Sequence, residues 1–539
     1  MLDRDQKLQA IEAIPPLAQG TTLTPDGEAP TDVYAIHGAD PEVLAYAMAK
    51  YSRSSLTMRE SLAEISSQRA EQFLNTFYFQ YGHRSIADLA HIPFAIERLS
   101  LLAAIELVDE QRWDGQERST RYQNFRKSGW FTPNLGTATA TYTSTIEALF
   151  AAYETTGHKM FEALQAAVSR PDSMKPEAYE RTLKARAFDV ARYLLPLATN
   201  TSLGQIVNAR TLETQVSRLL SSSFAEVRLL GEKLRSAAVQ PAWSVRDEAA
   251  RETLERISDM VAPHTLADLE DLLLREVKAA PTLLKHAESS RYQVDTASEL
   301  AEAAAQLTAN AAVAPSPVVD LLADDEPLDV ELATSLLYPH SHYSYRQLRS
   351  CVSSVSEAKR TEIVRLGTKH RGRHDELLRS LSAGYAFRFD ILMDLGGFRD
   401  MHRHRRCVQL LQGYTDQHGY EEPLCPGQPT LADAGIEESF RSAITAAHTA
   451  FRSLRTSTEP ESVMSAQYVL PLATRRRAMF KMDFAQAVYI SELRSGPAGH
   501  FSYRRVAWQM YRAVADRYPT LAHLFRVEDV NQPIDLLRR

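Results

Sequence analysis

Apolar residues recur every three or four positions over most of the chain, which is the spacing of an amphipathic helix. The clearest such stretches are residues 181–195, 252–280 and 437–454. Runs rich in aromatic and β-branched residues are fewer and shorter, and they predict strands. These runs cover residues 31–38, 92–99, 316–323 and 385–394. The pattern therefore predicts a helix-rich α+β protein with little sheet.

Three short segments of the first half recur in the second half in the same order. LAYAMAKYS resembles LLYPHSHYS, LLPLAT resembles VLPLAT, and APTLLK resembles YPTLAH. A single match of this length arises easily by chance, but three in the same order indicate a duplication. Because the repeat is long, it is a duplicated domain rather than a solenoid unit.

The stretch between the two copies, residues 297–317, is rich in Ala and Pro and poor in aromatic residues. This composition is typical of a short helix followed by a linker. We therefore place an N-terminal extension at residues 1–29, a first domain at 30–293, a linker at 294–317 and a second, more divergent domain at 318–539. Each copy is expected to hold a small sheet covered by long helices.

Composition narrows the function classes. The 539 residues carry a formal net charge of -7, whereas a general nucleic-acid binder usually presents a basic domain. Cys351, Cys407 and Cys425 have no C-x-x-C spacing, so neither a zinc ribbon nor a disulfide framework is predicted. The most apolar run, residues 99–108, is too short to cross a bilayer. We expect a cytoplasmic protein without a nucleic-acid or membrane partner.

Both copies contain segments rich in arginines and hydroxyl side chains, which bind phosphate groups well. In the first copy these segments are YGHRSIAD (81–88), ERSTRYQNF (117–125) and ARYLLPLATNTSLGQIVNAR (191–210). In the second copy they are MHRHRRC (401–407), QYVLPLATRRR (467–477) and SELRSG (491–496).

Together these segments resemble the flavin-dependent thymidylate synthase family, whose pattern is G-H-x-S, R-H-R-x(7)-S-x-R-Y, A-R-x-x-L-P-L and N-x-R. The R-H-R signature is split between the copies. The first copy keeps Ser119–Tyr122 but has Asp109–Gln111 in place of the basic triplet. The second copy keeps the triplet, Arg403–Arg405, but has Gly413 and Thr415 in place of the serine and arginine.

The later motifs divide in the same way. Arg192, Asn208 and Arg210 stand at the family positions in the first copy only. Arg494 stands at the position of the family's substrate arginine in the second copy, where the first copy has Leu219. Active sites of this family form between subunits, so the resemblance implies a pseudo-dimer with one composite site and one inactive pseudo-symmetric site.

The resemblance implies the methylation of dUMP to dTMP, with FAD as cofactor and NADPH and methylenetetrahydrofolate as co-substrates. The implied catalytic residues are Arg494 and Ser119. The implied substrate-binding residues are Glu117, Ser119, Arg121, Arg192, Arg403 and Arg494. The implied flavin-binding residues are Ser52, His83, Ser85, Asp88, Asn208, Arg210, Arg403, His404 and Arg405. It also implies a mostly antiparallel sheet in each copy, and self-association of the pseudo-dimer to a homodimer.

Some positions depart from the family. Its glutamine three residues before the triplet is Glu106 in the first copy and Asp400 in the second, and an acid there would repel a nucleotide phosphate. A family asparagine after N-x-R is Thr214 or Tyr489 here. Asp400, together with Asp109–Gln111 in place of the basic triplet, motivates a second hypothesis, a non-catalytic or repurposed nucleotide- or flavin-binding protein of the same fold. A third hypothesis, nucleic-acid binding through MHRHRRC, requires steeply salt-dependent binding.

Each cluster also has a plainer interpretation. MHRHRRC alone is typical of a solvated helix face, Arg475–Arg477 of surface ion pairs, and Ser119 of a helix cap. His402 and His404 are two positions apart and would point to opposite sides of a helix. His370 and His374 would share a helical face that Gly372 interrupts. We expect no metal site.

Overall fold

The computed structural model describes residues 34–36, 38–50, 56–64, 84–285, 287–373, 375–457 and 460–538. The chain divides into an N-terminal unit, Met1–Asp40, and a unit from Pro41 to Arg539. The helices and strands described below belong to the second unit, which includes the second predicted copy and the first one from Pro41 onward.

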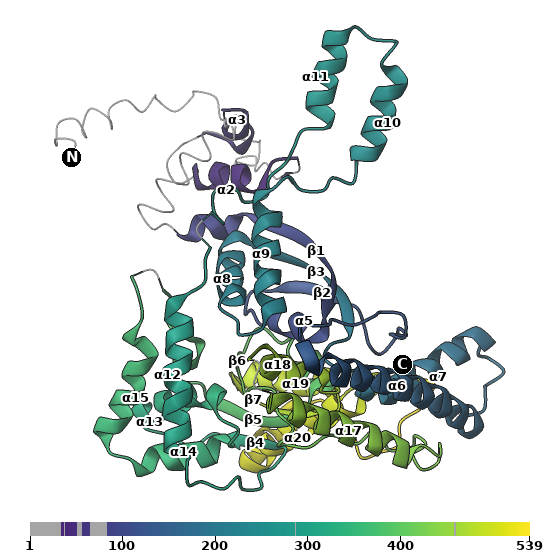
Figure 1. Cartoon of the computed structure of the whole chain (residues 1–539), viewed down its shortest axis with the longest axis vertical. Coiled ribbons are helices and arrows are strands. Elements are labelled where there is room, and N and C mark those ends of the chain that lie inside the picture. Colours follow the sequence, from purple (N-terminus) through teal and green to yellow (C-terminus); the bar gives the residue numbers. More distant parts are fainter. Residues whose placement is uncertain are drawn as a thin grey trace, which may run out of the picture. The chain divides into compact units, whose positions relative to one another are not determined.

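The first copy contains a three-stranded antiparallel sheet in the order β1-β3-β2 (Figure 1). Its strands are β1 (His91–Ser100), β2 (Asp114–Glu117) and β3 (Asn200–Asn208). The pairing of β1 with β3 shifts register between Glu97 and Leu99. Arg98 lies at this irregularity with a φ of 60°, the left-handed conformation that a bulge imposes.

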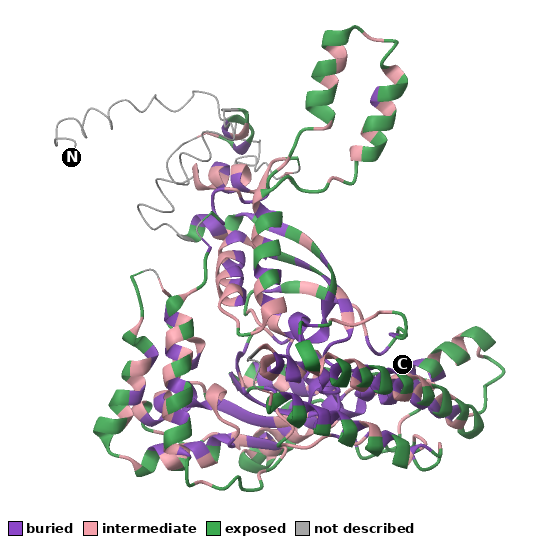
Figure 2. Cartoon of the chain, in the orientation of Figure 1, coloured by how far each residue is buried: buried purple, intermediate pink, exposed green. Residues whose placement is uncertain are grey.

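The second copy contains a four-stranded antiparallel sheet in the order β4-β5-β7-β6. Its strands are β4 (Val319–Leu322), β5 (Phe387–Asp394), β6 (Val408–Leu411) and β7 (Arg475–Met482). Strands β5 and β7 are buried almost throughout (Figure 2). Their charged side chains have partners: Arg477 lies 3.0 Å from Asp390, and Lys481 lies 3.2 Å from Glu331.

Helices make up most of the remaining described chain. In the first half they are α2 (Pro41–Lys50), α3 (Met58–Glu64), α5 (Leu101–Leu107), α6 (Thr139–Ala167), α7 (Pro176–Ala191), α8 (Ala209–Leu220), α9 (Ala225–Val239), α10 (Asp247–Ile257) and α11 (Pro263–Leu273). In the second half they are α12 (Arg291–Leu307), α13 (Leu328–Leu337), α14 (Tyr345–Ser354), α15 (Glu357–Lys369), α16 (Leu395–Met401), α17 (Glu437–Arg455), α18 (Pro460–Ser465), α19 (Phe484–Ser495) and α20 (Phe501–Arg517). The 3-10 helices are η2 (Arg84–Leu89), η3 (Gly136–Ala138), η4 (Arg192–Leu194), η5 (Tyr338–His340), η6 (Arg379–Leu381), η7 (Ala466–Val469) and η8 (Pro519–Leu524).

The order of elements confirms the duplication. The series β1, α5, β2, α6, β3, α8, α9 in the first copy matches β5, α16, β6, α17, β7, α19, α20 in the second. Equivalent helices even begin in the same way. The side chains of Ser100 and Asp394 cap α5 and α16, and those of Asn208 and Asp483 cap α8 and α19.

The repeated L-P-L-A-T segments pair with each other. Pro196 lies opposite Pro471 in an antiparallel bridge. Leu197 N donates to Leu470 O at 2.9 Å, and Leu472 N donates to Leu195 O at 2.9 Å. A self-complementary contact of this kind is the signature of a two-fold relation between two copies. Helices α6 and α17 pack together across the same boundary (Figure 1).

One apolar core runs through both copies. It includes Leu102 and Leu197 of the first copy and Phe398 and Leu472 of the second, all of which are fully buried. A smaller core joins α12 to α13, α14 and α15. The hydrophobic effect therefore holds the two copies together through a shared core, and they are not two separately packed domains joined by a linker.

The predicted helix-rich α+β class with two small antiparallel sheets is confirmed. Strands predicted at 92–99, 316–323 and 385–394 correspond to β1, β4 and β5. The strand predicted at 31–38 is wrong where it can be judged, because residues 34–36 and Gly38 are not in a strand. The helix predicted at 252–280 is broken, since Pro263 starts a new helix after α10 ends at Ile257. The domain limits stay a prediction.

Candidate functional site

The two halves of the split signature lie together at the end of α16. Arg399 Nη2 donates to Glu117 Oε2 at 2.5 Å, and Arg403 Nη2 lies 4.0 Å from the same oxygen. Glu117 ends β2 of the first copy, and its side chain is only 2% exposed. The ERSTRY segment and the basic triplet therefore share one charged cluster within a single chain.

Arg494 joins this cluster through the triplet. Its Nε donates to Nε2 of His404 at 2.8 Å, and its guanidinium lies 5.5 Å from the ring centre of Tyr503. Burial lowers the pKa of His404 to about 3, and the neighbouring charges of Arg494 and Arg405 add to the effect. The imidazole is therefore neutral at physiological pH and accepts this bond without cancelling the charge of Arg494.

Arg121 is buried and engaged by protein groups. Its Nε and Nη2 donate to the two carboxylate oxygens of Asp189 at 2.7 Å and 3.3 Å. Its Nη1 donates to Tyr503 Oη at 2.9 Å, and its Nη2 also reaches Ala498 O at 3.0 Å. The bidentate geometry is the one with which arginine grips an oxyanion, and here Asp189 supplies the oxyanion.

Arg192 has a similar internal partner. Its Nη1 and Nη2 lie 3.3 Å and 3.5 Å from Asp400 Oδ2, and Nη1 also lies 3.5 Å from Thr120 Oγ1. The Nε of Arg192 is buried and has no partner among the described residues. Ser119, beside Thr120, caps no helix; its Oγ accepts from Arg121 N at 3.2 Å.

Of the residues expected to bind flavin, Arg405 is the most informative. Its Nη1 donates to the carbonyls of Val108 and Glu110 at 2.6 Å and 3.2 Å, and its guanidinium stacks 4.8 Å from the ring centre of Trp113. Burial lowers its pKa to about 10. Its Nε and Nη2, like the Nε of Arg403, are buried donors without a partner in the described part of the chain.

The other expected flavin ligands form a separate group. Asp88 lies 3.4 Å from Arg210, which also pairs with Glu376 of the second copy at 2.9 Å. Asn208 caps α8, with its Oδ1 accepting from Thr211 N at 2.8 Å, and Ser85 is exposed in η2. Among the described residues no hydrogen bond or ion pair joins this group to the triplet. Ser52 and His83 lie outside the described residues.

The pseudo-symmetric half carries acids where the triplet would stand. Arg379 donates to Asp109 at 2.6 Å, and Arg218 lies 2.8 Å from Glu110. Although burial opposes it, Arg379, His402 and Arg218 lower the pKa of Asp109, which keeps that carboxylate charged. These acids line a cavity of about 1000 Å³ between the copies, together with Arg210. In this half, the two carboxylates therefore offset the positive charge of the arginines that face them.

Several plainer interpretations are wrong. MHRHRRC is not a solvated helix face, because α16 ends at Met401 and His402, His404 and Cys407 are buried. Arg476 and Arg477 are buried in β7 rather than exposed in surface ion pairs. His370 follows α15 and contacts Glu299 at 2.9 Å, while His374 lies outside the described residues. No group of potential metal ligands occurs in the described chain.

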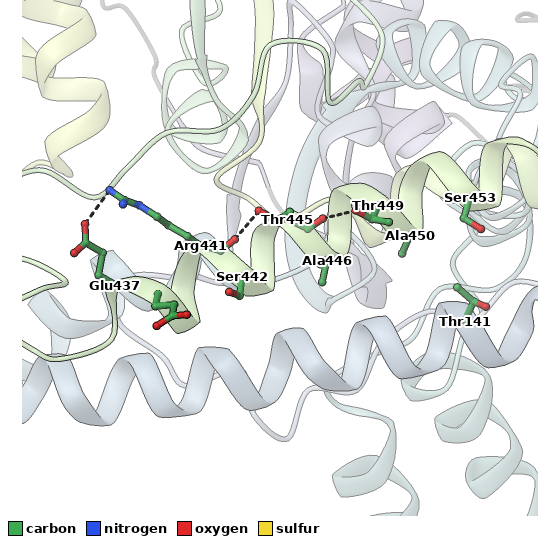
Figure 3. A pocket seen from close by; sticks show the side chains of 10 residues that line it. Thr141, Glu437, Arg441, Ser442, Thr445, Ala446, Thr449, Ala450 and Ser453 are labelled. Atoms are coloured by element: carbon green, nitrogen blue, oxygen red, sulfur yellow. Dashed lines mark hydrogen bonds and ion pairs between the residues drawn. The ribbon is translucent and has the colours of Figure 1, made fainter.

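A second cavity lies away from the predicted site residues. It is a surface groove of about 830 Å³ on α17, opposite Thr141 of α6 (Figure 3). Several of its polar side chains have partners within the protein: Arg441 pairs with Glu437 at 2.9 Å, and the hydroxyls of Thr445 and Thr449 donate to carbonyls of their own helix. It contains none of the predicted site residues. Within the described part of the chain, no helix is long and apolar enough to cross a membrane.

Three cluster residues were not among the predicted ligands. They are Arg399, Asp189 and Tyr503. Asp189 stands three residues before Arg192 on the buried face of α7, and a buried acid at that spacing predicts a basic partner. Arg399 could have been found by its position one residue before Asp400. The sequence carries no comparable signal for Tyr503.

Comparisons with known proteins identify related sequences. The thymidylate synthase complementing protein family matches residues 35–241 and again residues 320–520. A UPF0159 protein of Chlamydia pneumoniae is 28% identical over 539 aligned residues, which cover 94% of this chain and 93% of the relative. A flavin-dependent thymidylate synthase of Clostridium tetani is 25% identical over 177 residues, 32% of this chain and 67% of the relative.

Solved structures give a weaker likeness. The flavin-dependent thymidylate synthase of Helicobacter pylori, crystallised with FAD and dUMP, is 18% identical, with a TM-score of 0.23 over 37% of this chain and 89% of the other. The family match is the stronger finding, because it covers most of the sequence and falls on both copies. The chain therefore belongs to the thymidylate synthase complementing protein family and carries its domain twice in tandem.

Proposed function

We propose that this protein is a flavin-dependent thymidylate synthase that methylates dUMP to dTMP at a single composite site built from both copies of one chain. The observation that carries the proposal is the asymmetry between two arginine contacts, one on α19 and one on α8, where Arg218 lies one position before Leu219, the counterpart of Arg494. Arg494 contacts the neutral His404, whereas Arg218 contacts the carboxylate of Glu110. Only the first pair leaves a guanidinium beside the triplet without an ion-paired carboxylate among the described residues. The name of the Clostridium tetani relative supports the same reaction class.

The composite site has donors that fit a flavin nucleotide. Buried Nε atoms of Arg403 and Arg405, and Nη2 of Arg405, have no acceptor among the described residues. Leaving such donors unpaired is costly, so they favour an acceptor-rich ligand such as a dinucleotide. A bound FAD would supply the redox chemistry of the reaction, with NADPH as reductant and methylenetetrahydrofolate as the one-carbon donor. Arg403, His404 and Arg405 would hold it.

Arg494 would act on the pyrimidine. His404 holds its Nε, and its two terminal nitrogens have no protein partner among the described residues. They are therefore available to a carbonyl oxygen of uracil, on which negative charge develops as C5 becomes nucleophilic. Ser119, Glu117 and Arg403 would orient the nucleotide beside it. A preorganised guanidinium in a partly buried site stabilises such charge without rearrangement of solvent.

The first experiment is an absorbance spectrum of the purified full-length chain, followed by tritium release from [5-³H]dUMP with methylenetetrahydrofolate and NADPH. We expect a flavin spectrum and release of tritium. Arg494→Gln should lower the rate by about 100-fold or more, as the loss of one oxyanion donor does. Arg218→Gln, the same change in the arginine of α8 that contacts Glu110, should leave the rate within about threefold. A colourless protein that does not bind added FAD would contradict the proposal.

The alternative is a non-catalytic nucleotide- or flavin-binding protein of the same fold. It is motivated by the carboxylates of Asp400 and Glu117, which already occupy several arginines of the composite site. This alternative predicts binding of FAD or dUMP without tritium release. The expected homodimer stays a prediction that analytical ultracentrifugation can test.

A further inference from the structure

Asp400 is the residue of the composite site that the family resemblance explains least. It lies in the last turn of α16, and its carboxylate faces Arg192 at 3.3 Å and 3.5 Å. The Arg192 side chain is only 2% exposed and that of Asp400 is 19% exposed. The resemblance implies glutamine at this position and assigns Arg192 to the substrate phosphate. The carboxylate thus stands beside the group expected to hold an anion.

The charge around Asp400 comes from both copies. Burial raises its pKa, but Arg192, Arg121, Arg403 and Arg494 together lower it below the ordinary value. Two of these arginines belong to the first copy and two to the second. The carboxylate is therefore ionised and lies in a field that would equally attract a phosphate.

The charges of the arginines in the cluster can be matched with those of nearby carboxylates, one pair at a time. Asp189 compensates Arg121, Asp400 compensates Arg192, and Glu117 compensates Arg399. No carboxylate among the described residues lies within hydrogen-bonding distance of Arg403 or Arg494. The cluster thus keeps positive charge for a ligand, but the arginine most deeply buried in it is already neutralised.

The equivalent acid in the other copy behaves differently. Glu106 stands where Asp400 stands, and its Oε1 accepts from Tyr414 Oη at 2.9 Å. The counterpart of Arg192 in that half is Gln467, and no arginine of the described residues lies within ion-pair distance of Glu106, although Arg218 is close enough to feel its charge. An acid at this position is therefore ion-paired with arginine only in the half that holds the composite site.

We propose that Asp400 is an internal anion that occupies the place of the substrate phosphate against Arg192. A phosphate-bearing ligand has to displace it, and Asp400 therefore sets the affinity of the site for phosphate. This inference deepens the proposed function by naming the residue that controls selection between a nucleotide and an uncharged nucleoside. Unlike the glutamine of the family pattern, a carboxylate cannot donate to a phosphate oxygen and repels it.

The test compares wild type, Asp400→Gln and the matched control Glu106→Gln in the full-length chain. Inorganic phosphate, dUMP and deoxyuridine are titrated by calorimetry at low ionic strength. Asp400→Gln should bind phosphate and dUMP about tenfold tighter or more, the effect expected when a charge-assisted hydrogen bond to Arg192 becomes available. Deoxyuridine affinity should stay the same in all three chains, and Glu106→Gln should match wild type throughout.

Further variants keep the test decisive. Asp400→Asn, which keeps the shape of the side chain, replaces Asp400→Gln if the latter does not fold. Adding Arg192→Gln to either variant should abolish the gain in phosphate affinity. Unchanged or weaker phosphate binding by the folded Asp400 variants would overturn the inference. The binding of inorganic phosphate measures the effect of Asp400 whether or not the chain turns over dUMP. If the variants gain phosphate affinity but the wild-type chain releases no tritium, the inference stands and only the proposed function is refuted.

Discussion

Arg494 donates a hydrogen bond from its Nε to Nε2 of His404 over 2.8 Å. In the first copy, where Leu219 stands at the position of Arg494, the preceding residue Arg218 contacts the carboxylate of Glu110 instead. A neutral imidazole and a carboxylate can both orient a guanidinium, but only the carboxylate cancels its charge. At the middle position of the triplet, histidine therefore leaves the neighbouring arginine charged, whereas glutamate neutralises it.

This relationship predicts losses of very different size for two substitutions of His404. His404→Glu should reproduce the Arg218–Glu110 pair and lower kcat/KM for tritium release by about 100-fold or more, because Arg494 loses its free charge. His404→Gln keeps a neutral acceptor and should stay within about tenfold of wild type. Equal losses in both variants would show that the imidazole itself, rather than its neutrality, is required.

The buried neutral histidine also predicts how stability depends on pH. His404 has its pKa lowered to about 3 in the folded chain from an ordinary value of 6.5. Between these values the unfolded chain binds the proton more readily, so the stability contribution is complete above pH 6.5 and is lost as the pH falls. At pH 5 the loss is about 2 kcal/mol.

Thermal unfolding at pH 7.5 and pH 5 measures this effect. A loss of about 2 kcal/mol corresponds to a Tm lower by about 2 °C for a chain of this length. Burial lowers the pKa of His402 as well, to about 4, so the wild-type shift should be larger than this single contribution. His404→Gln should show a smaller shift than wild type. His264→Gln, at an exposed position, should match wild type.

The sequence predicted which arginine-rich segments meet better than it predicted the partners of their side chains. The split of the R-H-R signature between the copies correctly placed Glu117 and Arg403 in one cluster. Spacing along the chain was enough, because both copies keep the strand–helix–strand frame that carries the motif. The partners of Arg121 and Arg192, in contrast, come from other elements, α7 and α16, and no local pattern indicates such contacts.

The strands show the same limit. β7 contains three consecutive arginines, which sequence reasoning placed at the surface, yet Arg477 is buried because Asp390 on β5 compensates it. β3 alternates buried and exposed positions, but its polar residues obscured that pattern. Residues 34–36 have strand-like composition, yet they pair with no described strand. Burial of charge and pairing of strands depend on distant partners, which a single segment does not encode.

The Arg192–Asp400 pair predicts a non-additive effect on stability. Arg192→Gln leaves a largely buried carboxylate without its closest partner and should cost about 3 kcal/mol. Asp400→Gln leaves a buried guanidinium and should cost a similar amount. For 539 residues, about 3 kcal/mol lowers Tm by about 3 °C. The double variant should recover most of this loss, because residues in contact couple by about 1–3 kcal/mol. Strictly additive Tm shifts would contradict the pairing.

A final prediction concerns whether one chain is enough. Glu117 of the first copy and Arg403 of the second lie 4.0 Å apart within the same molecule, so the composite site needs no second chain. Ser119→Ala and Arg403→Ala should each lower tritium release by about 100-fold. An equimolar mixture should remain as inactive as either variant, because every chain then carries one defect in its own site. Recovery of about a quarter to a half of the wild-type rate on mixing would mean that sites form between chains. Arg406→Ala controls for loss of a triplet-adjacent charge, because Arg406 is exposed, pairs with Asp483 at 2.9 Å and should keep full activity.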